Sequence, residues 1–463
     1  MEGNSSHPQN SYFFFNLGCP KNLVDAERTA ARLEEAGWRG VGSPRDASLL
    51  IVTTCAFIAK AEEESINEIL RLATQKEEWQ WLVVLGCLVT REGAALQRLL
   101  PEVDLFLGIE EMEQLSERLG SIVLDRRAGG GAGIGERILF TPSHLAYLKI
   151  AEGCSNHCSY CLIPSMRGEL RSRDRDEILG EAAHLVEAGV RELVIIAQDT
   201  GAWRCEYTTG SGRTRSPRLE GGSSPPSGEW TLYDLLEDLS TVGAEWLRLL
   251  YLHPAHIDVE RLLALIDCGA ICPYLDIPVQ HASDRILDLM GRGYTRADLD
   301  RIFGTLRLKN DRIVLRTTVM VGYPGETDSD FEELLHFLDE ISFDHVGVFT
   351  FSPEKGTKAL SQGPSVEEEE RCRRRDEVLA LQMDISHERL AARVGTVERI
   401  LVDEVLSEAG RPSPGVWGAG RFFGQAYEVD GFTYLSGTVR DPGTFVSVYI
   451  YHADAYDLFA SVP

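Results

Sequence analysis

The chain has 463 residues, of which 43% are hydrophobic and 25% are charged. This length exceeds what one hydrophobic core usually supports, so we expect two or three domains. The formal net charge of −26 argues against a large phosphate-binding surface and is compatible with a basic partner. The sequence contains no apolar run long enough to span a bilayer and no signal peptide, so we expect a cytoplasmic protein without a membrane partner. In that compartment the ten cysteines are expected to be metal ligands, catalytic groups or core residues, not disulfides.

Three apolar segments near the N-terminus each end in a cysteine, at Cys19, Cys55 and Cys87. Each is followed by a stretch with helical periodicity, over residues 23–36, 61–72 and 93–100. This order predicts a parallel α/β domain, which we assign to residues 11–127. Neighbouring parallel strands are about 4.8 Å apart and end at one edge, so the three thiols are expected within about 10 Å. The alternative for each cysteine is an ordinary core residue.

A second strand and helix alternation occupies residues 136–380 and predicts a partial (β/α)6 barrel with its chemistry in the loops after the strands. We expect its strands at residues 144–153, 191–199, 245–254, 274–280, 312–322 and 345–352. We expect its helices at residues 176–188, 232–239, 259–266, 296–308 and 328–341. The Gly-rich segment 127–137 is expected to be a hairpin or linker. Residues 205–229, rich in Gly, Ser, Pro and Arg, are expected to be a disordered insertion.

The C-terminal part begins after a charged helix expected at residues 366–393. Four short segments with alternating polarity follow, at residues 399–406, 423–430, 432–439 and 444–453. This pattern predicts a small antiparallel β-barrel, assigned to residues 388–463. From residue 391 onward there are five Arg and no Lys against nine acidic residues, a net charge of −4.

The stretch EGCSNHCSYC places Cys154, Cys158 and Cys161 in the first loop of the predicted barrel. Structural zinc sites usually combine two close cysteine or histidine pairs, and no second pair lies nearby. His157 is the one candidate for a fourth ligand inside the run, but its adjacency to Cys158 would strain joint ligation. A cubane iron–sulfur cluster fits better, because three thiolates hold three irons and leave the fourth iron open for a small molecule.

The run CSNHCSYC resembles the CxxxCxxC signature of radical S-adenosylmethionine enzymes. With LGCPKNLVDAE near the N-terminus and the small C-terminal barrel, nearly the whole chain is similar to the methylthiotransferase family, whose last domain is called TRAM. The resemblance implies that Cys154, Cys158 and Cys161 hold a 4Fe–4S cluster that binds S-adenosylmethionine. It also implies that Cys19, Cys55 and Cys87 hold a second 4Fe–4S cluster, where a sulfide is methylated and then transferred to a substrate radical.

Three short stretches resemble the protein-modifying branch of that family: Gly18 with GCPKN, AQDT at 197–200, and IPVQHAS at 277–283. By this resemblance the substrate is the β-carbon of an aspartate in ribosomal protein uS12. Charge is an independent argument, because a tRNA-binding TRAM domain should be basic and a ribosomal protein is usually basic. An acidic surface that serves only solubility is the alternative. The electron donor and the sulfur source are not identified by the sequence, and tRNA is not expected to be the substrate.

For S-adenosylmethionine we name three candidate contacts, Tyr160, Gln280 and Arg316, together with the turn GYPGET at 322–327. The resemblance places Tyr160 near the adenine. Arg316 lies inside an apolar strand, so a carboxylate ligand or a structural ion pair must balance its charge. No catalytic side chain is assigned from the sequence. Asp199 is interpreted as a possible helix cap.

The remaining four cysteines are treated as non-ligands. Cys205 is placed in the insertion, Cys268 and Cys272 in a core segment, and Cys372 in the charged helix. Three hypotheses therefore stand: a uS12 aspartate methylthiotransferase, a tRNA adenosine methylthiotransferase, and a zinc-stabilised binding protein without redox chemistry.

Overall fold

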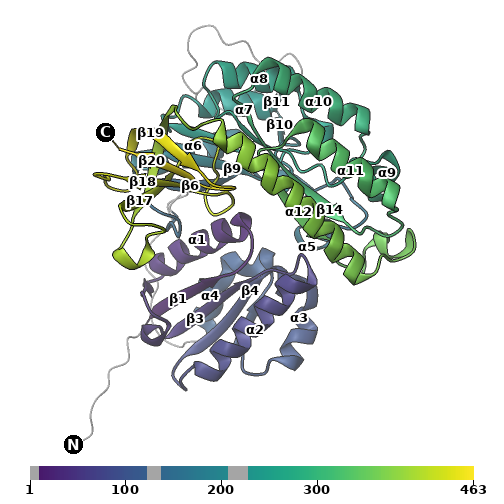
Figure 1. Ribbon diagram of the computed structural model, residues 1–463. Coiled ribbons are helices and arrows are strands. Elements are labelled where there is room, and N and C mark those ends of the chain that lie inside the picture. Colours follow the sequence, from purple (N-terminus) through teal and green to yellow (C-terminus); the bar gives the residue numbers. More distant parts are fainter. Residues whose placement is uncertain (1–9, 123–136, 207–227, 463) are drawn as a thin grey trace, which may run out of the picture.

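A computed structural model describes residues 10–122, 137–206 and 228–462. Figure 1 shows three bodies: an N-terminal α/β domain, a central half-barrel and a small C-terminal barrel. This arrangement confirms the predicted α/β fold class with its three parts. The domain limits 11–127, 136–380 and 388–463 remain predictions. In the described residues, no helix is long and apolar enough to cross a membrane.

The N-terminal domain is a five-stranded parallel sheet in the order β2-β1-β3-β4-β5. Its strands are β1 (Ser11–Asn16), β2 (Arg39–Gly40), β3 (Leu49–Thr54), β4 (Trp81–Gly86) and β5 (Leu105–Leu107). Its helices are α1 (Pro20–Glu35), α2 (Ala59–Gln75), α3 (Cys87–Leu99) and α4 (Leu115–Ile122). Every residue of β3 is buried, because helices cover both faces of the sheet. The three predicted strand and helix pairs are confirmed.

The central part is a six-stranded parallel sheet in the order β15-β14-β13-β12-β9-β6. Its strands are β6 (Leu145–Lys149), β9 (Glu192–Ile196), β12 (Trp246–Leu249), β13 (Tyr274–Asp276), β14 (Val314–Val321) and β15 (His345–Thr350). Its helices are α5 (Ile163–Arg167), α6 (Arg175–Glu187), α7 (Leu232–Leu239), α8 (Val259–Asp267), α9 (Asp284–Met290), α10 (Arg296–Lys309) and α11 (Asp328–Ile341). The terminal strands β15 and β6 do not pair, so the predicted partial barrel is confirmed.

Several short elements were not predicted. Strands β10 (Arg204–Glu206) and β11 (Glu229–Thr231) form an antiparallel pair at the two ends of the insertion, so those ends are ordered, contrary to the predicted disorder of 205–229. The residues 207–227 between them, and most of the Gly-rich segment 127–137, lie outside the described residues. Strands β7 (Ala151–Glu152) and β8 (Arg171–Ser172) pair across the cysteine loop.

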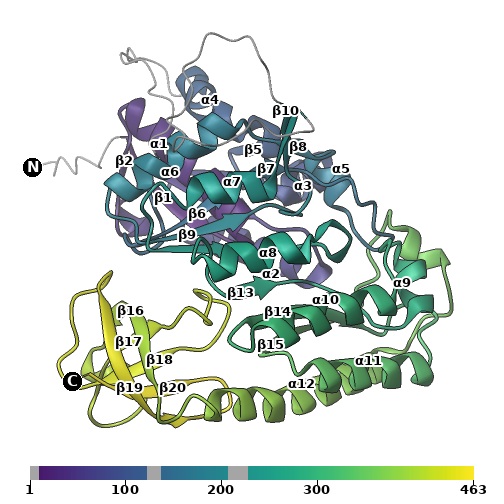
Figure 2. The same ribbon diagram turned by 90° about the horizontal axis from the view of Figure 1, so that it is seen from above.

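The long helix α12 (Glu368–Ala391) connects the half-barrel to the C-terminal barrel, as Figure 2 shows. That barrel is closed in the order β16-β17-β18-β20-β19. Its strands are β16 (Val397–Val405), β17 (Val416–Arg421), β18 (Thr433–Ser436), β19 (Phe445–Ala453) and β20 (Leu458–Ser461). It is not wholly antiparallel, because β18 and β20 run parallel.

One predicted strand of this barrel is wrong. Residues 423–430 form turns, and the strand lies before them, at Val416–Arg421. Its sequence VWGAGR lacks a clear alternation because Gly420 sits where a side chain would collide with the Leu401 carbonyl oxygen of β16. The strand was not predicted because the close approach of two backbones requires glycine at this position, and glycine interrupts the alternation of polar and apolar side chains.

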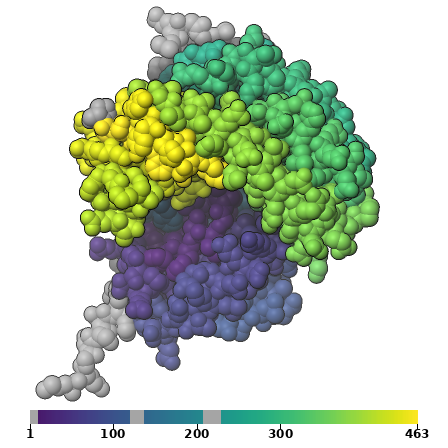
Figure 3. All heavy atoms as spheres, in the orientation of Figure 1, coloured from purple at the N-terminus to yellow at the C-terminus, as the bar shows by residue number. Residues whose placement is uncertain are grey.

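Buried ion pairs join the three parts. Glu181 of α6 accepts from Arg28 of α1 at 2.9 Å and from Arg137 at 2.7 Å. On the other side, Glu192 of β9 pairs with Arg421 of the C-terminal barrel at 2.7 Å, and both side chains are fully buried. Figure 3 shows a hollow where the N-terminal domain faces the other two parts. The amino end of α1 contacts the half-barrel where Lys21 lies over the ring of Tyr251, after β12.

Candidate active site

The first cysteine trio lies at one edge of the N-terminal sheet. Cys19 directly precedes α1, Cys55 follows β3, and Cys87 is the first residue of α3 after β4. The Oδ1 atom of Asn22 lies 3.9 Å from Cys19 Sγ and 3.7 Å from Cys87 Sγ. The side-chain Nδ2 of Asn22 donates to the Thr54 carbonyl at 2.9 Å, which fixes the side chain between two of the thiols.

Cys55 is held by a buried serine of α2. The Cys55 amide donates to Ser65 Oγ at 3.2 Å, and Ser65 Oγ lies 2.8 Å from the Ala61 carbonyl, to which it donates. Ser65 is fully buried, so this side chain ties the loop after β3 to the first turns of α2. This contact could not be predicted from the sequence, because a serine inside a helix commonly points to solvent or bonds within its own helix.

The second trio lies in the loop between β7 and α5. The Cys154 amide donates to the Gly168 carbonyl at 3.1 Å, and the Cys161 amide donates to the Cys158 carbonyl at 3.0 Å. Gly153, just before the trio, has φ +75°, and a Cβ there would collide with the Glu169 carbonyl oxygen. Only glycine allows this close approach of the two loop strands.

Side chains from other barrel loops hold this cysteine loop in place. Arg292 donates to Cys158 Sγ and to Tyr160 Oη, both at 3.4 Å. Ser159 Oγ lies 2.7 Å from the hydroxyl of Tyr323, which belongs to the turn at 322–327. Tyr160 packs against the buried apolar cluster that includes Met290 and Tyr323. The loop is therefore anchored at the backbone and through three of its own side chains.

The donor chemistry and the spacing of both trios fit a cluster better than a single ion. Thiolates that share one zinc ion at about 2.3 Å would lie about 3.8 Å apart. Within the described residues, the single group of three metal-binding side chains whose ligand atoms all lie within 4.8 Å is Asp199, His253 and His256, and neither trio belongs to it. A cubane carries each thiolate on a different iron and so requires a wider spacing.

Burial shifts the pKa of four of the six cysteine thiols upward. It raises the pKa of Cys55 to about 11 and that of Cys161 to about 12. It also raises the pKa of Cys154, and that of Cys87 despite the opposing charge of Arg167. These four thiols are neutral near pH 7 without a metal, so cluster binding must release protons.

Arg167 connects the two trios. It is the last residue of α5, six residues after Cys161, and its Nη2 lies 3.6 Å from Cys87 Sγ while bonding to Asn22. Its Nη1 pairs with Glu152 at 2.8 Å and with Asp25 of α1 at 3.3 Å. The side chain is 2% exposed. The buried guanidinium of Arg167 therefore contacts the first trio, while its backbone lies in the helix that directly follows the loop of the second trio.

The predicted cofactor residues Gln280 and Arg316 have different surroundings. Gln280 has φ +67°, and its amide donates to the Thr318 carbonyl at 2.8 Å. A non-glycine residue in this region is strained, which is common at ligand sites. Arg316 pairs with Asp276 at 3.0 Å and with Asp430 of the C-terminal barrel at 3.4 Å. The structural ion pair, one of two alternatives for Arg316, is thus present, and its role toward the cofactor stays a prediction.

Two interpretations from the sequence are wrong. Asp199 does not cap a helix: it accepts from Asn156 of the cysteine loop at 2.8 Å and from His256 at 2.7 Å. Its position after β9 makes it a support for the loop. Cys268 is exposed, not part of the core, because it follows the last turn of α8. Cys272 is buried as expected, and His157 is largely exposed beside Glu169.

Arg167 and Arg292 were not predicted from the sequence, and Lys21 and Asn22 had no predicted role within GCPKN. Arginines next to cysteine sites carry no local pattern, since their partners lie elsewhere in the chain. A basic residue in an otherwise apolar segment was the one available signal. It was used for Arg316 alone.

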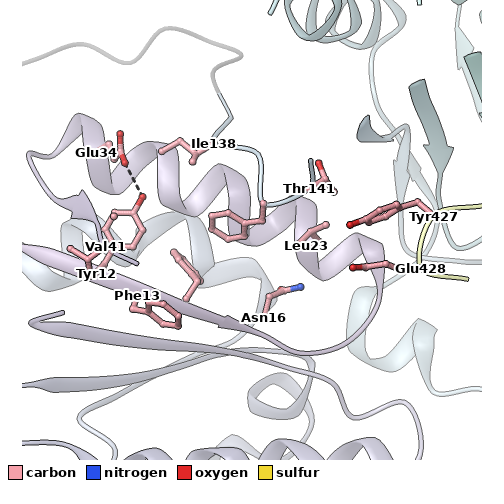
Figure 4. Close-up of a pocket in the computed structure, with 13 residues that line it drawn as sticks. Tyr12, Phe13, Asn16, Leu23, Glu34, Val41, Ile138, Thr141, Tyr427 and Glu428 are labelled. Carbon is pink, nitrogen blue, oxygen red and sulfur yellow. Dashed lines mark hydrogen bonds between the residues drawn. The ribbon is translucent and has the colours of Figure 1, made fainter. Parts of the chain in front are cut away.

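A cavity of about 480 Å³ lies beside this region, between β1, α1 and the C-terminal barrel (Figure 4). Tyr12, Phe13 and Leu23 line one side, and Tyr427 and Glu428 line the other. None of the predicted cofactor or metal residues lines it. The cavity is therefore separate from the cysteine site.

Comparison with known families follows this division of the chain. Residues 11–108 match a family described as uncharacterized protein family UPF0004, residues 148–338 match the radical SAM superfamily, and residues 394–462 match the TRAM domain. The fold and the cysteine loop thus define a radical SAM protein with two additional domains.

Relatives identify the family. The ribosomal protein uS12 methylthiotransferase RimO of Syntrophus aciditrophicus is 42% identical, over 98% of each chain. That of Syntrophomonas wolfei is 40% identical over 96% of this chain and 98% of its own, and that of Anaeromyxobacter sp. (strain K) is 39% identical over 97% and 92%. The chain belongs to the RimO family, which confirms the resemblance to methylthiotransferases.

Proposed function

We propose that this chain is an enzyme that attaches a methylthio group to the β-carbon of an aspartate in ribosomal protein uS12. The single observation that carries the proposal is the docking of α1 onto the half-barrel, where Arg167, six residues after Cys161, contacts Cys87 of the first trio. Lys149 of β6 pairs with Asp25 of α1 and with Glu152 at 2.8 Å, beside Arg167 and its contact to Cys87. A radical centre and a sulfur carrier must share one site if sulfur is to reach a substrate radical.

The residues present fit two 4Fe–4S clusters. Cys154, Cys158 and Cys161 would hold one and Cys19, Cys55 and Cys87 the other, each with one iron free of protein ligands. With S-adenosylmethionine, such a cluster supplies a radical able to remove hydrogen from a carbon that no side-chain base could deprotonate. The chain itself binds, orients and shields the reacting groups.

Particular side chains would perform this positioning. Arg292, beside Cys158 Sγ, provides a fixed positive charge next to the thiolates, and Asp199 holds Asn156 of the same loop. Tyr160 and Gln280 are proposed to contact S-adenosylmethionine. For Arg316 we propose an indirect role, because its charge is already balanced by Asp276.

The acidity of the chain supports a basic protein substrate over tRNA. The net charge is −26 overall and −4 from residue 391 onward. A surface of this sign attracts a basic ribosomal protein and repels phosphate. The reaction would take place in the cytosol, where ribosomal proteins are made, with an electron donor and a sulfur source that the chain does not specify.

The test is an assay with anaerobically reconstituted protein, S-adenosylmethionine, a reductant and sulfide. We expect about eight irons per chain and the mass of one methylthio group on an aspartate of purified uS12. Modification of tRNA without modification of uS12 would replace the proposal by the tRNA hypothesis. Stoichiometric zinc with no visible absorption would replace both by the binding-protein hypothesis.

A further inference from the structure

Lys21, in the first turn of α1, is a buried cation that forms no ion pair with the described part of the chain. Its side chain extends from the N-terminal domain onto the half-barrel, where Nζ lies 3.2 Å from the ring centroid of Tyr251. The residue is 7% exposed, and within the described residues its ammonium makes no hydrogen bond or ion pair. The neighbouring buried cations differ, since Lys149 and Arg167 both pair with Glu152.

An unpaired ammonium at this depth is unfavourable. A cation–π contact offsets only part of the free energy needed to remove an ammonium group from water. Lys21 follows Cys19 by two residues, and Tyr251 follows β12 at the carboxyl end of the half-barrel. The unpaired charge therefore lies beside the first trio, where the N-terminal domain meets the carboxyl end of the half-barrel.

Tyr251 is held in a strained conformation beneath this lysine. Its φ is +62°, its amide donates to Asp276 Oδ2 at 3.1 Å, and its carbonyl accepts from the Thr200 amide at 3.1 Å. Strain that is maintained by several bonds commonly marks a ligand site. Here it holds the ring as a platform that fixes the lysine head group.

We propose that Lys21 is a specificity-determining residue that binds the carboxylate of the substrate aspartate while its β-carbon is modified. This inference rests on the proposed function. Cofactor carboxylate is expected at the second trio, so an anion arriving at Lys21 belongs to the substrate. Asp276 and Glu152 also lie near, but each already has a cationic partner, in Arg316 and Arg167 respectively.

The test compares uS12 carrying the modified aspartate with uS12 carrying asparagine there, for the wild type, Lys21→Met, Lys21→Arg and the surface control Lys309→Met. We expect the wild type and Lys309→Met to prefer the aspartate protein at least tenfold in kcat/KM. Lys21→Met should lose this preference to within twofold, mainly through a higher KM. Lys21→Arg should keep part of it, because the charge remains.

Equilibrium binding of the two uS12 proteins to reconstituted enzyme, without S-adenosylmethionine, gives the same ratio when turnover is too slow to measure. Equal iron content of Lys21→Met and wild type shows that the site is assembled. A Lys21→Met variant with full iron and an undiminished preference for aspartate overturns the inference and leaves the proposed function standing. A wild type that does not modify uS12 at all overturns the proposed function itself.

Discussion

Each of the two cysteine trios supplies three thiol groups, but the chain brings the three cysteines together differently in the two cases. The second trio comes from one loop of eight residues, Cys154 to Cys161, between β7 and α5. The first is collected from the ends of three strands, and its successive cysteines are 36 and 32 positions apart in the sequence. One site is defined locally, and the other exists only when the sheet has formed.

This difference affects how each trio is supported. The second is anchored by its own backbone, as in the Cys154 to Gly168 bond. The first relies on side chains such as Asn22 and Ser65, and on Arg167 from another domain. The first site should therefore be the more sensitive to loss of packing or domain docking.

The largest expected effect comes from removing each trio. Replacing Cys19, Cys55 and Cys87 with alanine should leave about four of about eight irons, and replacing Cys154, Cys158 and Cys161 should leave the other four. Both triple variants should lose methylthio transfer, and the second should also lose cleavage of S-adenosylmethionine. Iron analysis, EPR and product chromatography measure these outcomes. A single iron–sulfur centre that remains unchanged when the first trio is replaced would contradict the presence of two separate cluster sites.

Arg167→Gln should have the next largest effect. It leaves Asp25 and Glu152 with one fewer cation in a buried region, so the free energy of unfolding should fall by about 3 kcal/mol. Chemical denaturation measures this value. Arg171→Gln, at a side chain 62% exposed, should change it by less than about 0.5 kcal/mol. Iron should be lost preferentially from the first site, and equal loss from both sites would show that Arg167 does not distinguish them.

Acid should weaken the docking that the first site needs. Burial alone would raise the pKa of Glu181, but Arg173, Arg28 and Arg137 lower it to about 2. The folded state thus binds this proton less readily than the unfolded state, so the stabilisation is complete above about pH 4.5 and is lost as the pH falls toward 2. It amounts to roughly 3 kcal/mol at most.

Thermal melting between pH 7 and pH 3 tests this dependence. Glu181→Gln should be less stable than the wild type at pH 7 and should lose less stability on acidification. Glu187→Gln, an exposed change at the end of the same helix, should follow the wild-type curve. If the melting temperatures of Glu181→Gln and the wild type fall in parallel with pH, ionisation of Glu181 does not stabilise the docked domains.

The smallest effects should come from two serines, one at each site. Ser65→Ala and Ser159→Ala each remove hydrogen bonds of a buried hydroxyl and should cost about 1 kcal/mol, or a melting temperature lower by about 2–4 °C. Ser65→Ala should lower iron loading of the first site, and Ser159→Ala that of the second. Ser240→Ala, at an exposed serine after the last turn of α7, is the matched control. Loss of iron from the opposite site would contradict the separation of the two trios.

The sequence determined the layout of the molecule and the second trio. The run LLIVTT is continuous and buried at every position, as expected for a strand covered on both faces of a parallel sheet. The spacing of Cys154, Cys158 and Cys161 is local, and the loop needs few distant contacts to form. Pattern failed where glycine replaced side chains, as in the strand Val416–Arg421.

Only the tertiary structure decided how the trios are joined. Arg167 and Lys21 have ordinary sequence surroundings, and their importance arises because α1 docks on the half-barrel and removes both from water. Which charge is paired and which is left for a ligand depends on distances between segments far apart in the chain. Sequence periodicity indicates which face of a helix or strand is buried, but it does not indicate which residues that face will contact.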